Sequence, residues 1–93
     1  MLSRVCSQIS AKGRKMNAKI EKKIGYNIRR LRESAKMTQE YVAAQLQLYG
    51  CDITRSSIAK IEVGQRHLYP DEIMYLKQIL KVSYDDIFNI NQG

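Results

Sequence analysis

The spacing of apolar residues constrains the fold most, because they return every three or four positions in each patterned segment. Ile20, Ile24, Ile28 and Leu31 form such a stripe between residues 19 and 35, with charged residues on the other sides. This period is typical of an amphipathic helix. No segment shows the sustained alternation of a half-buried strand. The sequence therefore predicts an all-α fold.

Further helices are predicted by their start and stop signals, over residues 39–48, 55–63, 70 to about 81, and a short segment after Ser83. Thr38 and Thr54 are good N-caps, and Pro70 suits the first turn of a helix. Gly64 is well placed to end the third helix. We expect five helices in one domain over residues 19–90, preceded by an arm at 1–18 and followed by a frayed tail at 91–93.

Composition narrows the function classes. With 93 residues, the chain has room for one small domain, and no apolar run reaches the ~18 residues that a membrane span needs. Cys6 and Cys51 are too few for a disulfide scaffold and lack metal-ligand spacing, and His67 is the single histidine. An enzyme would need converging titratable groups, and none is evident. We expect a cytoplasmic, non-enzymatic binding domain with no cofactor, metal or small-molecule ligand.

The positive charge is concentrated at the start of the chain. Lys and Arg number 16 against 9 Asp and Glu, a net charge of +7. Residues 1–23 carry +6 of this and residues 24–93 carry +1. Such an arm suits a polyanion such as nucleic acid, because phosphate neutralisation releases counterions. A solvated tail that only aids solubility is the alternative interpretation.

Two consecutive short helices suggest a binding surface. The helices predicted at 39–48 and 55–63 each begin at a threonine cap, and the second exposes Arg55, Ser56, Ser57 and Lys60. A helix-turn-helix uses one helix to cross the phosphates and offers the N-terminal polar residues of the next to the major groove. A plain helical bundle with one solvated face fits the pattern equally well.

Four ordered motifs resemble the Cro/CI-type (XRE) helix-turn-helix family over residues 24–88. They are Ile28-Arg29-Arg30-Leu31-Arg32-Glu33, Met37-Thr38-Gln39-Glu40, the run from Thr54 to Gly64, and Val82-Ser83-Tyr84-Asp85-Asp86-Ile87-Phe88. The resemblance implies a five-helix, lambda repressor-like domain. It also implies binding to double-stranded DNA by a transcriptional regulator, in the first instance a repressor that occludes a promoter.

The same resemblance implies residue roles. Base edges would be read by Arg55, Ser56 and Lys60. Phosphates would be bound by Thr38, Gln39, Ser57, Gln65 and Arg66, with Gln39 also bracing the recognition helix. Arg32 and Glu62 occupy the positions of a structural ion pair that links the first helix to the third.

The sequence departs from the family in three places. Seven residues, 47–53, separate Leu46 from Thr54, where the family has about two. The resemblance therefore does not fix the tilt of the recognition helix in the groove. Lys36 stands where a glycine often ends the first helix, which implies a different exit geometry. Val63 replaces a polar residue that is common before the glycine.

Two further hypotheses concern partners. A weak homodimer would use the final helices around Tyr84, Ile87, Phe88 and Ile90. The alternative function is a protein-interaction module, such as the antitoxin of a toxin–antitoxin pair, which would show an exposed apolar surface. Beyond the core, the sequence offers little spare apolar material to form one, although Leu2, Val5 and Ile9 in the arm are candidates.

Overall fold

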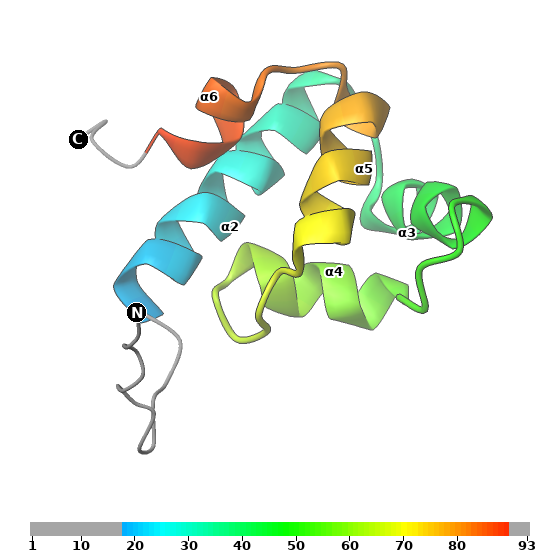
Figure 1. The fold of residues 1–93 in the computed structure, drawn as a ribbon, viewed down its shortest axis with the longest axis horizontal. Helices are drawn as coiled ribbons and strands as arrows, with labels where there is room; N and C mark the ends of the chain where they lie inside the picture. The colour runs from blue at the N-terminus through cyan, green and yellow to red at the C-terminus, as the bar shows by residue number, and fades with distance from the viewer. Residues whose placement is uncertain (1–17, 90–93) are drawn as a thin grey trace, which may run out of the picture.

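Five helices and no strand make up residues 18–89, the part of the chain that the computed structural model describes (Figure 1). They are α2 (Ala18–Ser34), α3 (Gln39–Leu48), α4 (Arg55–Glu62), α5 (Pro70–Leu80) and α6 (Tyr84–Phe88). The all-α, five-helix prediction is confirmed, with helix ends within a residue or so of those expected. The predicted arm at 1–18 and tail at 91–93 lie outside the described residues, apart from Ala18, which opens α2.

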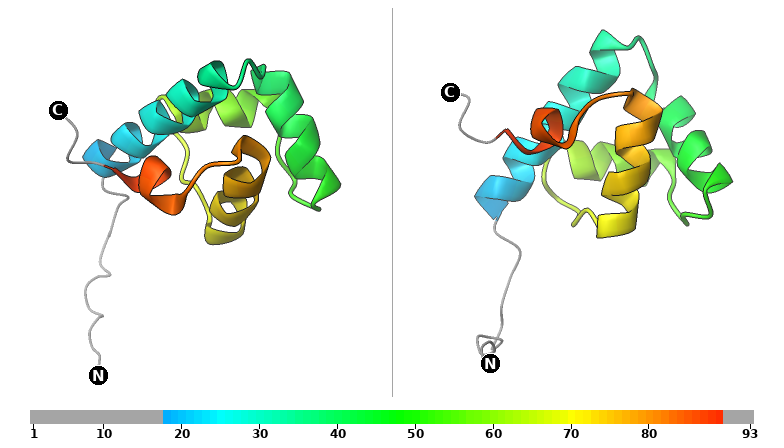
Figure 2. Two further views of the ribbon diagram at one scale, coloured as in Figure 1. Left: turned by 90° about the horizontal axis from the view of Figure 1, so that it is seen from above. Right: turned by 45° about the horizontal axis from the view of Figure 1, so that its top comes forward.

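The helices surround one apolar core. α4 packs against both α2 and α3, α3 also contacts α5, and α6 lies along α2 (Figures 1 and 2). The largest fully buried side chains come from every helix and from the turn before α4: Ile28, Val42, Leu46, Ile53, Ile58, Leu76 and Ile87. The stripes of apolar residues thus meet in the middle and hold α4 at one edge of the domain.

A glycine sets the close approach of α2 and α4. A Cβ built on Gly25 would lie 2.1 Å from the carbonyl oxygen of Ile61 and 2.9 Å from backbone atoms of Glu62. No side chain fits at that distance, and the obstacle is backbone rather than a movable side-chain tip. The crossing of α2 over the end of α4 therefore requires glycine at position 25.

The end of α2 corrects one expectation. Lys36 has φ 59°, the left-handed conformation that favours glycine, and its N–H donates to the carbonyl of Glu33 at 3.0 Å. The N–H of Met37 returns to the carbonyl of Arg32 at 3.0 Å, which completes the helix end. Lys36 therefore reproduces the helix end that a glycine would give, and the expected change of exit geometry is not seen.

The long turn between α3 and α4 is anchored to the domain. Gly50 has φ 94° and reverses the chain, and Cys51 and Ile53 are buried in the core. The Tyr49 ring stacks on Tyr75 of α5, with ring centroids 4.5 Å apart. The additional residues thus pack against α5 rather than loosening the start of α4.

A buried asparagine ties α6 to α2. Asn27 is almost fully buried, and its Nδ2 donates to the carbonyl oxygens of Ile87 at 2.9 Å and Asn89 at 3.2 Å. The Ile87 side chain is itself fully buried in the domain core. It is therefore not free for the dimer surface predicted from the sequence, and Ile90 lies outside the described residues.

Candidate nucleic-acid interface

The start of α4 is held by a reciprocal capping box. The N–H of Ser57 donates to Thr54 Oγ1 at 3.2 Å, and the N–H of Thr54 donates to Ser57 Oγ at 3.3 Å. Two backbone donors at the helix start are thereby satisfied by side chains that the sequence places three residues apart. The first turn of α4 is consequently well defined, and with it the direction of the side chains that follow.

The buried and exposed sides of α4 carry different types of residue. Ile58, Ile61 and Glu62 are buried on the side that faces the domain. Arg55, Ser56 and Lys60 are all exposed, as the sequence predicts, whereas Ser57 is half-buried. α4 therefore presents two cations and a hydroxyl to solvent along its outer side.

Arg55 lies where α3 and α4 both begin. It lines one surface depression together with Arg32, Met37, Thr38, Gln39 and Glu40, and another with Gln39, Thr54, Ser56 and Ala59. The Thr38 hydroxyl at this edge accepts the N–H of Tyr41 at 3.0 Å and caps α3. The structure thus brings Thr38 and Gln39 beside two of the three residues predicted to read bases.

A buried polar network fixes the far end of α4. Arg32 of α2 donates from Nε to Glu62 Oε2 at 2.6 Å and from Nη2 to Oε1 at 3.1 Å. The family resemblance implied this pair, and the two side chains are in bidentate contact. Gln39 Nε2 donates to the same Glu62 Oε1 at 3.0 Å, and Arg32 Nη1 donates to the Met37 carbonyl at 2.8 Å. One carboxylate thereby links α2, α3 and α4.

This pair has little contact with solvent: the exposed fraction of the side chain is 10% for Arg32 and 2% for Glu62. The hydrogen bond to Glu62 raises the pKa of Arg32 more than burial lowers it. The guanidinium is therefore charged at neutral pH and pairs with the Glu62 carboxylate as a cation.

The loop after α4 contains a second ion pair, which was not predicted from the sequence. Arg66 donates from Nη1 and Nη2 to the two carboxylate oxygens of Glu72, at 2.9 and 3.0 Å. The same carboxylate accepts the N–H of Tyr69, so it also closes the start of α5. Arg66 is half-buried and already partnered, whereas Gln65, the other loop residue predicted to bind phosphate, is exposed.

A histidine joins the same loop to α2. His67 Nδ1 lies 2.8 Å from Glu21 Oε2, and its ring meets the Tyr69 ring edge-on with centroids 4.9 Å apart. No sequence signal pairs these residues, because they are 46 positions apart. The contact is made only because α2 and the loop after α4 are neighbours in the fold.

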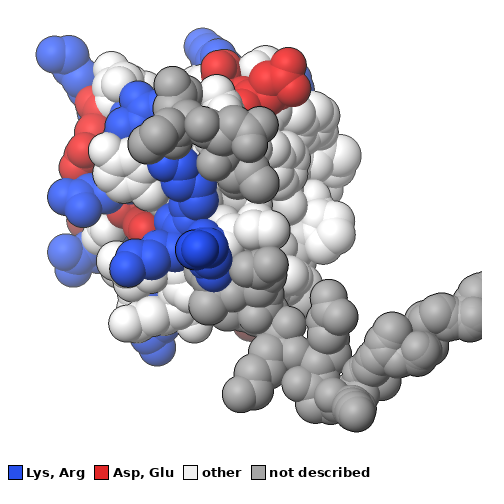
Figure 3. All heavy atoms as spheres, turned by 90° about the vertical axis from the view of Figure 1, so that its left-hand side faces the viewer, with Lys and Arg blue, Asp and Glu red and all other residues white. Residues whose placement is uncertain are grey.

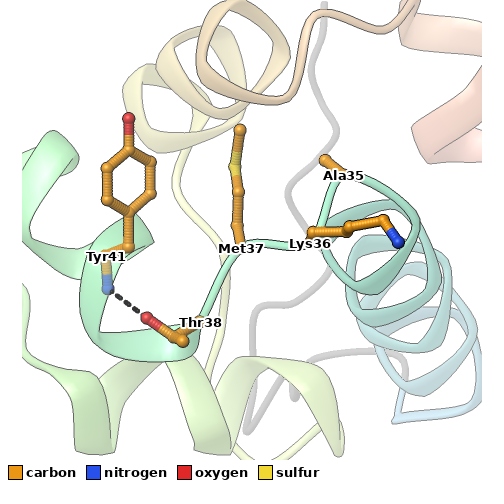
Figure 4. Close-up of a pocket in the computed structure, with 5 residues that line it drawn as sticks. All are labelled: Ala35, Lys36, Met37, Thr38 and Tyr41. Atoms are coloured by element: carbon orange, nitrogen blue, oxygen red, sulfur yellow. Dashed lines mark hydrogen bonds between the residues drawn. The ribbon is translucent and has the colours of Figure 1, made fainter.

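A pocket at the turn from α2 to α3 is shown in Figure 4. It is lined by Ala35, Lys36, Met37, Thr38 and Tyr41. The Lys36 side chain extends away from Tyr41, and the Thr38 hydroxyl is already bonded to the Tyr41 N–H (Figure 4). The pocket thus brings together no converging pair of titratable groups and borders the start of α3.

The residues that the structure describes contain no group of three or more His, Cys, Asp or Glu side chains that could hold a metal ion. Over the same residues, 18–89, no helix is long and apolar enough to cross a membrane. The surface depressions at the starts of α3 and α4 bring together four of the predicted site residues that contact DNA: Thr38, Gln39, Arg55 and Ser56.

Comparison with known families decides what this arrangement is. A family model described as a helix-turn-helix matches residues 28–87, well over half of the chain. The chain belongs to this helix-turn-helix family. The resemblance to Cro/CI-type domains is thus confirmed, and α3 and α4 are the two helices of the motif. No curated protein and no solved structure matched the chain.

The helix-turn-helix family is one of DNA-binding transcription regulators, and this general function applies to the chain. In such a domain the second helix of the motif enters the major groove, while the first crosses the phosphate backbone. In chain order, α3 is the first of these two helices and α4 the second.

Proposed function

We propose that the domain binds double-stranded DNA sequence-specifically and that α4 is its recognition helix. The observation that carries the proposal is the exposure of Arg55, Ser56 and Lys60 on a helix whose C-terminal end is anchored by the buried Glu62. A reading helix needs free polar groups on a rigid frame. Arg55 suits a guanine, to which it would donate two hydrogen bonds, and Ser56 suits several bases.

Phosphate contacts in this proposal come from residues around the reading face. Thr38 and Gln39 lie beside Arg55 at the start of α3, Ser57 lies in the first turn of α4, and Gln65 follows the end of α4. Arg66 would contact phosphate through whichever N–H groups its pair with Glu72 leaves outward. These contacts set affinity and register without carrying sequence information.

The regulatory sign that we propose is repression. A domain of this size that covers the major groove at a promoter blocks access by occupancy alone, without a catalytic step. Selection of random duplexes by the purified protein, scored for a consensus and its symmetry, tests sequence-specific binding. A reporter gene placed behind that consensus then tests repression.

Substitution of Arg55 tests the reading assignment directly. Arg55→Ala is expected to weaken binding to the selected site by about 1–3 kcal/mol and to relax one base position. The matched control is Arg29→Ala, which removes an exposed arginine from α2. Equal losses for Arg55→Ala on every duplex sequence would show that Arg55 does not read a base.

Lys60 is tested by the dependence of affinity on salt. If Lys60 reads a base, Lys60→Ala is expected to behave like Arg55→Ala and relax one position. If it contacts phosphate, all sequences should weaken alike, and the slope of log affinity against log salt should fall by about 1. A variant with unchanged affinity and slope would remove Lys60 from the interface.

We further propose a weak homodimer through α6 that DNA strengthens. The Tyr84 and Phe88 rings are exposed and stack with centroids 6.4 Å apart, and Lys77 Nζ lies 5.3 Å from the Tyr84 centroid. Paired domains on an inverted repeat would place their recognition helices about 34 Å apart. Sedimentation equilibrium showing a monomer both free and on the selected duplex would rule the dimer out.

A second candidate function is a protein-interaction module. The exposed apolar side chains that could serve it include Leu48 at the end of α3, with an exposed fraction of 81%, and Met74 and Phe88. Selection of random duplexes that yields no consensus, while the protein binds a partner through Leu48, would favour this function. A consensus that depends on Arg55 would favour DNA recognition.

A further inference from the structure

The start of α2 lies against the loop that follows α4. A Cβ built on Gly64 would lie 2.7 Å from Lys22 Cα and 2.9 Å from Lys22 Cβ, so the two residues approach each other closely. One position earlier on α2, Glu21 reaches His67 of the same loop at 2.8 Å. The start of α2 and the end of the helix-turn-helix motif are therefore in contact, and both lie at the lower left of Figure 1.

The side chain of Lys22 is exposed at this contact. Among the described residues, its ammonium group forms no hydrogen bond and no ion pair. The carboxylates that α2, α4 and α5 bring to this part of the domain, those of Glu21, Glu62 and Glu72, are each bonded to a histidine or an arginine. Lys22 is thus a cation that is available to a ligand.

Two more exposed side chains border the same loop. The N–H of Gln65 donates to the Lys60 carbonyl at 2.8 Å, so these residues lie together where α4 ends. Gly64 joins Gln65 to the point at which Lys22 makes its contact. Figure 3 looks onto the side on which α2 begins and α4 ends, and it shows several Lys and Arg side chains gathered there. Two ammonium groups and an amide therefore border the end of α4.

A duplex held by α4 brings phosphates close to this end of the helix. At ~1.5 Å rise per residue, the eight residues of α4 span about 12 Å. The major groove is also about 12 Å wide, so a helix that enters it with its N-terminal residues has its other end near a phosphate strand. Gln65 is a phosphate ligand in the proposed function, and Lys22 adjoins it through Gly64. A lysine suits this ligand, because its flexible stem carries a point charge that requires no fixed direction of approach.

We propose that Lys22 binds a phosphate of the duplex that α4 reads, beside the end of α4. The proposal rests on α4 being the recognition helix. It adds to the DNA-binding surface a residue of α2 that precedes the helix-turn-helix motif, and the close contact with Gly64 is what places Lys22 there.

Substitution of Lys22 in the full chain tests the contact. Lys22→Ala is expected to weaken binding about fivefold at about 100 mM salt and to lower the slope of log affinity against log salt by about 0.9. The loss should be the same on the selected duplex and on a mixed-sequence duplex of equal length, because a phosphate contact carries no sequence information. Lys22→Arg, which keeps the charge, is expected to bind like the wild type. Fluorescence anisotropy titrations at several salt concentrations measure these affinities.

The matched control is Lys81→Ala. Lys81 is exposed at the end of α5, and Figure 1 shows that end on the side of the domain away from α4. The control removes the same charge from the chain and should leave both the affinity and the salt slope unchanged. Thermal unfolding of both variants should match that of the wild type, since each lysine is exposed.

Duplexes with single uncharged methylphosphonate linkages locate the contact. One such linkage in the selected duplex is expected to weaken binding of the wild type about fivefold. The same linkage should leave the affinity of Lys22→Ala unchanged, since the phosphate charge that it removes has already lost its partner. Linkages elsewhere should weaken the wild type and Lys22→Ala by equal factors.

Several outcomes would overturn the proposal. They are wild-type affinity and salt slope in Lys22→Ala, equal losses in Lys22→Ala and Lys81→Ala, and a loss confined to the selected duplex. A methylphosphonate scan in which every linkage weakens Lys22→Ala as it weakens the wild type would also overturn it. Failure of the proposed function has a different signature, since Arg55→Ala would then weaken the selected and mixed-sequence duplexes alike, whatever the result for Lys22.

Discussion

The two sides of α4 use polar residues in opposite ways. On the packed side, the Glu62 carboxylate accepts hydrogen bonds from Arg32 and Gln39 and is hidden from solvent. On the outer side, Arg55 and Lys60 are exposed to solvent. A buried charge is tolerated only when it is paired, whereas an exposed cation costs little and is available to a ligand.

Under the proposed function, the residues that orient α4 and the residues that read DNA are therefore separate groups within the eight residues of this helix. Substitutions on the packed side should change stability first and DNA binding only through it. Substitutions on the outer side should change DNA binding and leave stability nearly unaffected. The following predictions test this division, from the largest expected effect to the smallest.

Removal of Arg32 should have the largest effect. Arg32→Ala leaves Glu62 buried with Gln39 as its remaining side-chain partner, and we expect the free energy of unfolding to fall by about 3–5 kcal/mol. Urea denaturation monitored by circular dichroism measures this. Arg29→Ala, which breaks an exposed pair with Glu33, should cost below about 1 kcal/mol. Similar costs for the two arginines would abolish the distinction between the buried pair and the exposed one.

A methyl group at Gly25 should separate α2 from α4. Gly25→Ala places its Cβ against the Ile61 carbonyl, and such overpacking is expected to cost about 1–3 kcal/mol despite the better helix propensity of alanine. Thermal unfolding measures the loss. Ala44→Gly, at an exposed position of α3, provides a control in which the propensity term acts alone. A stabilised Gly25→Ala variant would show that a methyl group fits between α2 and α4.

Loss of the α4 cap should lower both the stability of the domain and its affinity for DNA. Thr54→Ala removes the acceptor of the Ser57 N–H, with an expected cost of about 1 kcal/mol in the free energy of unfolding. Because Arg55 and Ser56 follow the cap, affinity for the selected duplex should also fall. Thr54→Ser, which keeps the hydroxyl, should restore both properties. Loss of stability with unchanged affinity would show that the cap does not position the reading residues.

The smallest effect is expected at the end of α2, far from the reading side. Lys36→Gly relieves a left-handed backbone at φ 59° and should stabilise the domain by up to about 1 kcal/mol, offset in part by the entropy of glycine. Urea denaturation tests this, and DNA affinity should not change. A marked destabilisation would mean that the side chain contributes more than the backbone strain costs.

The buried thiol offers a chemical test of the long turn. Burial, followed by the nearby carboxylates of Asp71 and Glu72, raises the pKa of Cys51 above its ordinary value. Cys51 should therefore react slowly with a thiol reagent at neutral pH, and quickly only when the domain unfolds. Rapid labelling of the folded protein, confined to Cys51, would show that the turn before α4 opens.

Much of the reading side was predictable from the sequence. Thr54 caps a helix whose apolar residues fall on one side, so the exposure of Arg55 and Lys60 followed from local periodicity. The Arg32–Glu62 pair was foreseen only through resemblance to the family. The role of Gly25 was missed, because a glycine within a helical pattern carries no signal of what crosses it.

Local physical chemistry in the sequence determined the helices, their caps and the polar side of α4, because those features depend on residues within about four positions of one another. Only the tertiary structure decided that Gln39 joins the Arg32–Glu62 pair, that Arg66 is bound by Glu72, and which side of α2 faces outward. These contacts depend on how the helices cross. The crossing is set by close packing of the whole core, which no local pattern encodes.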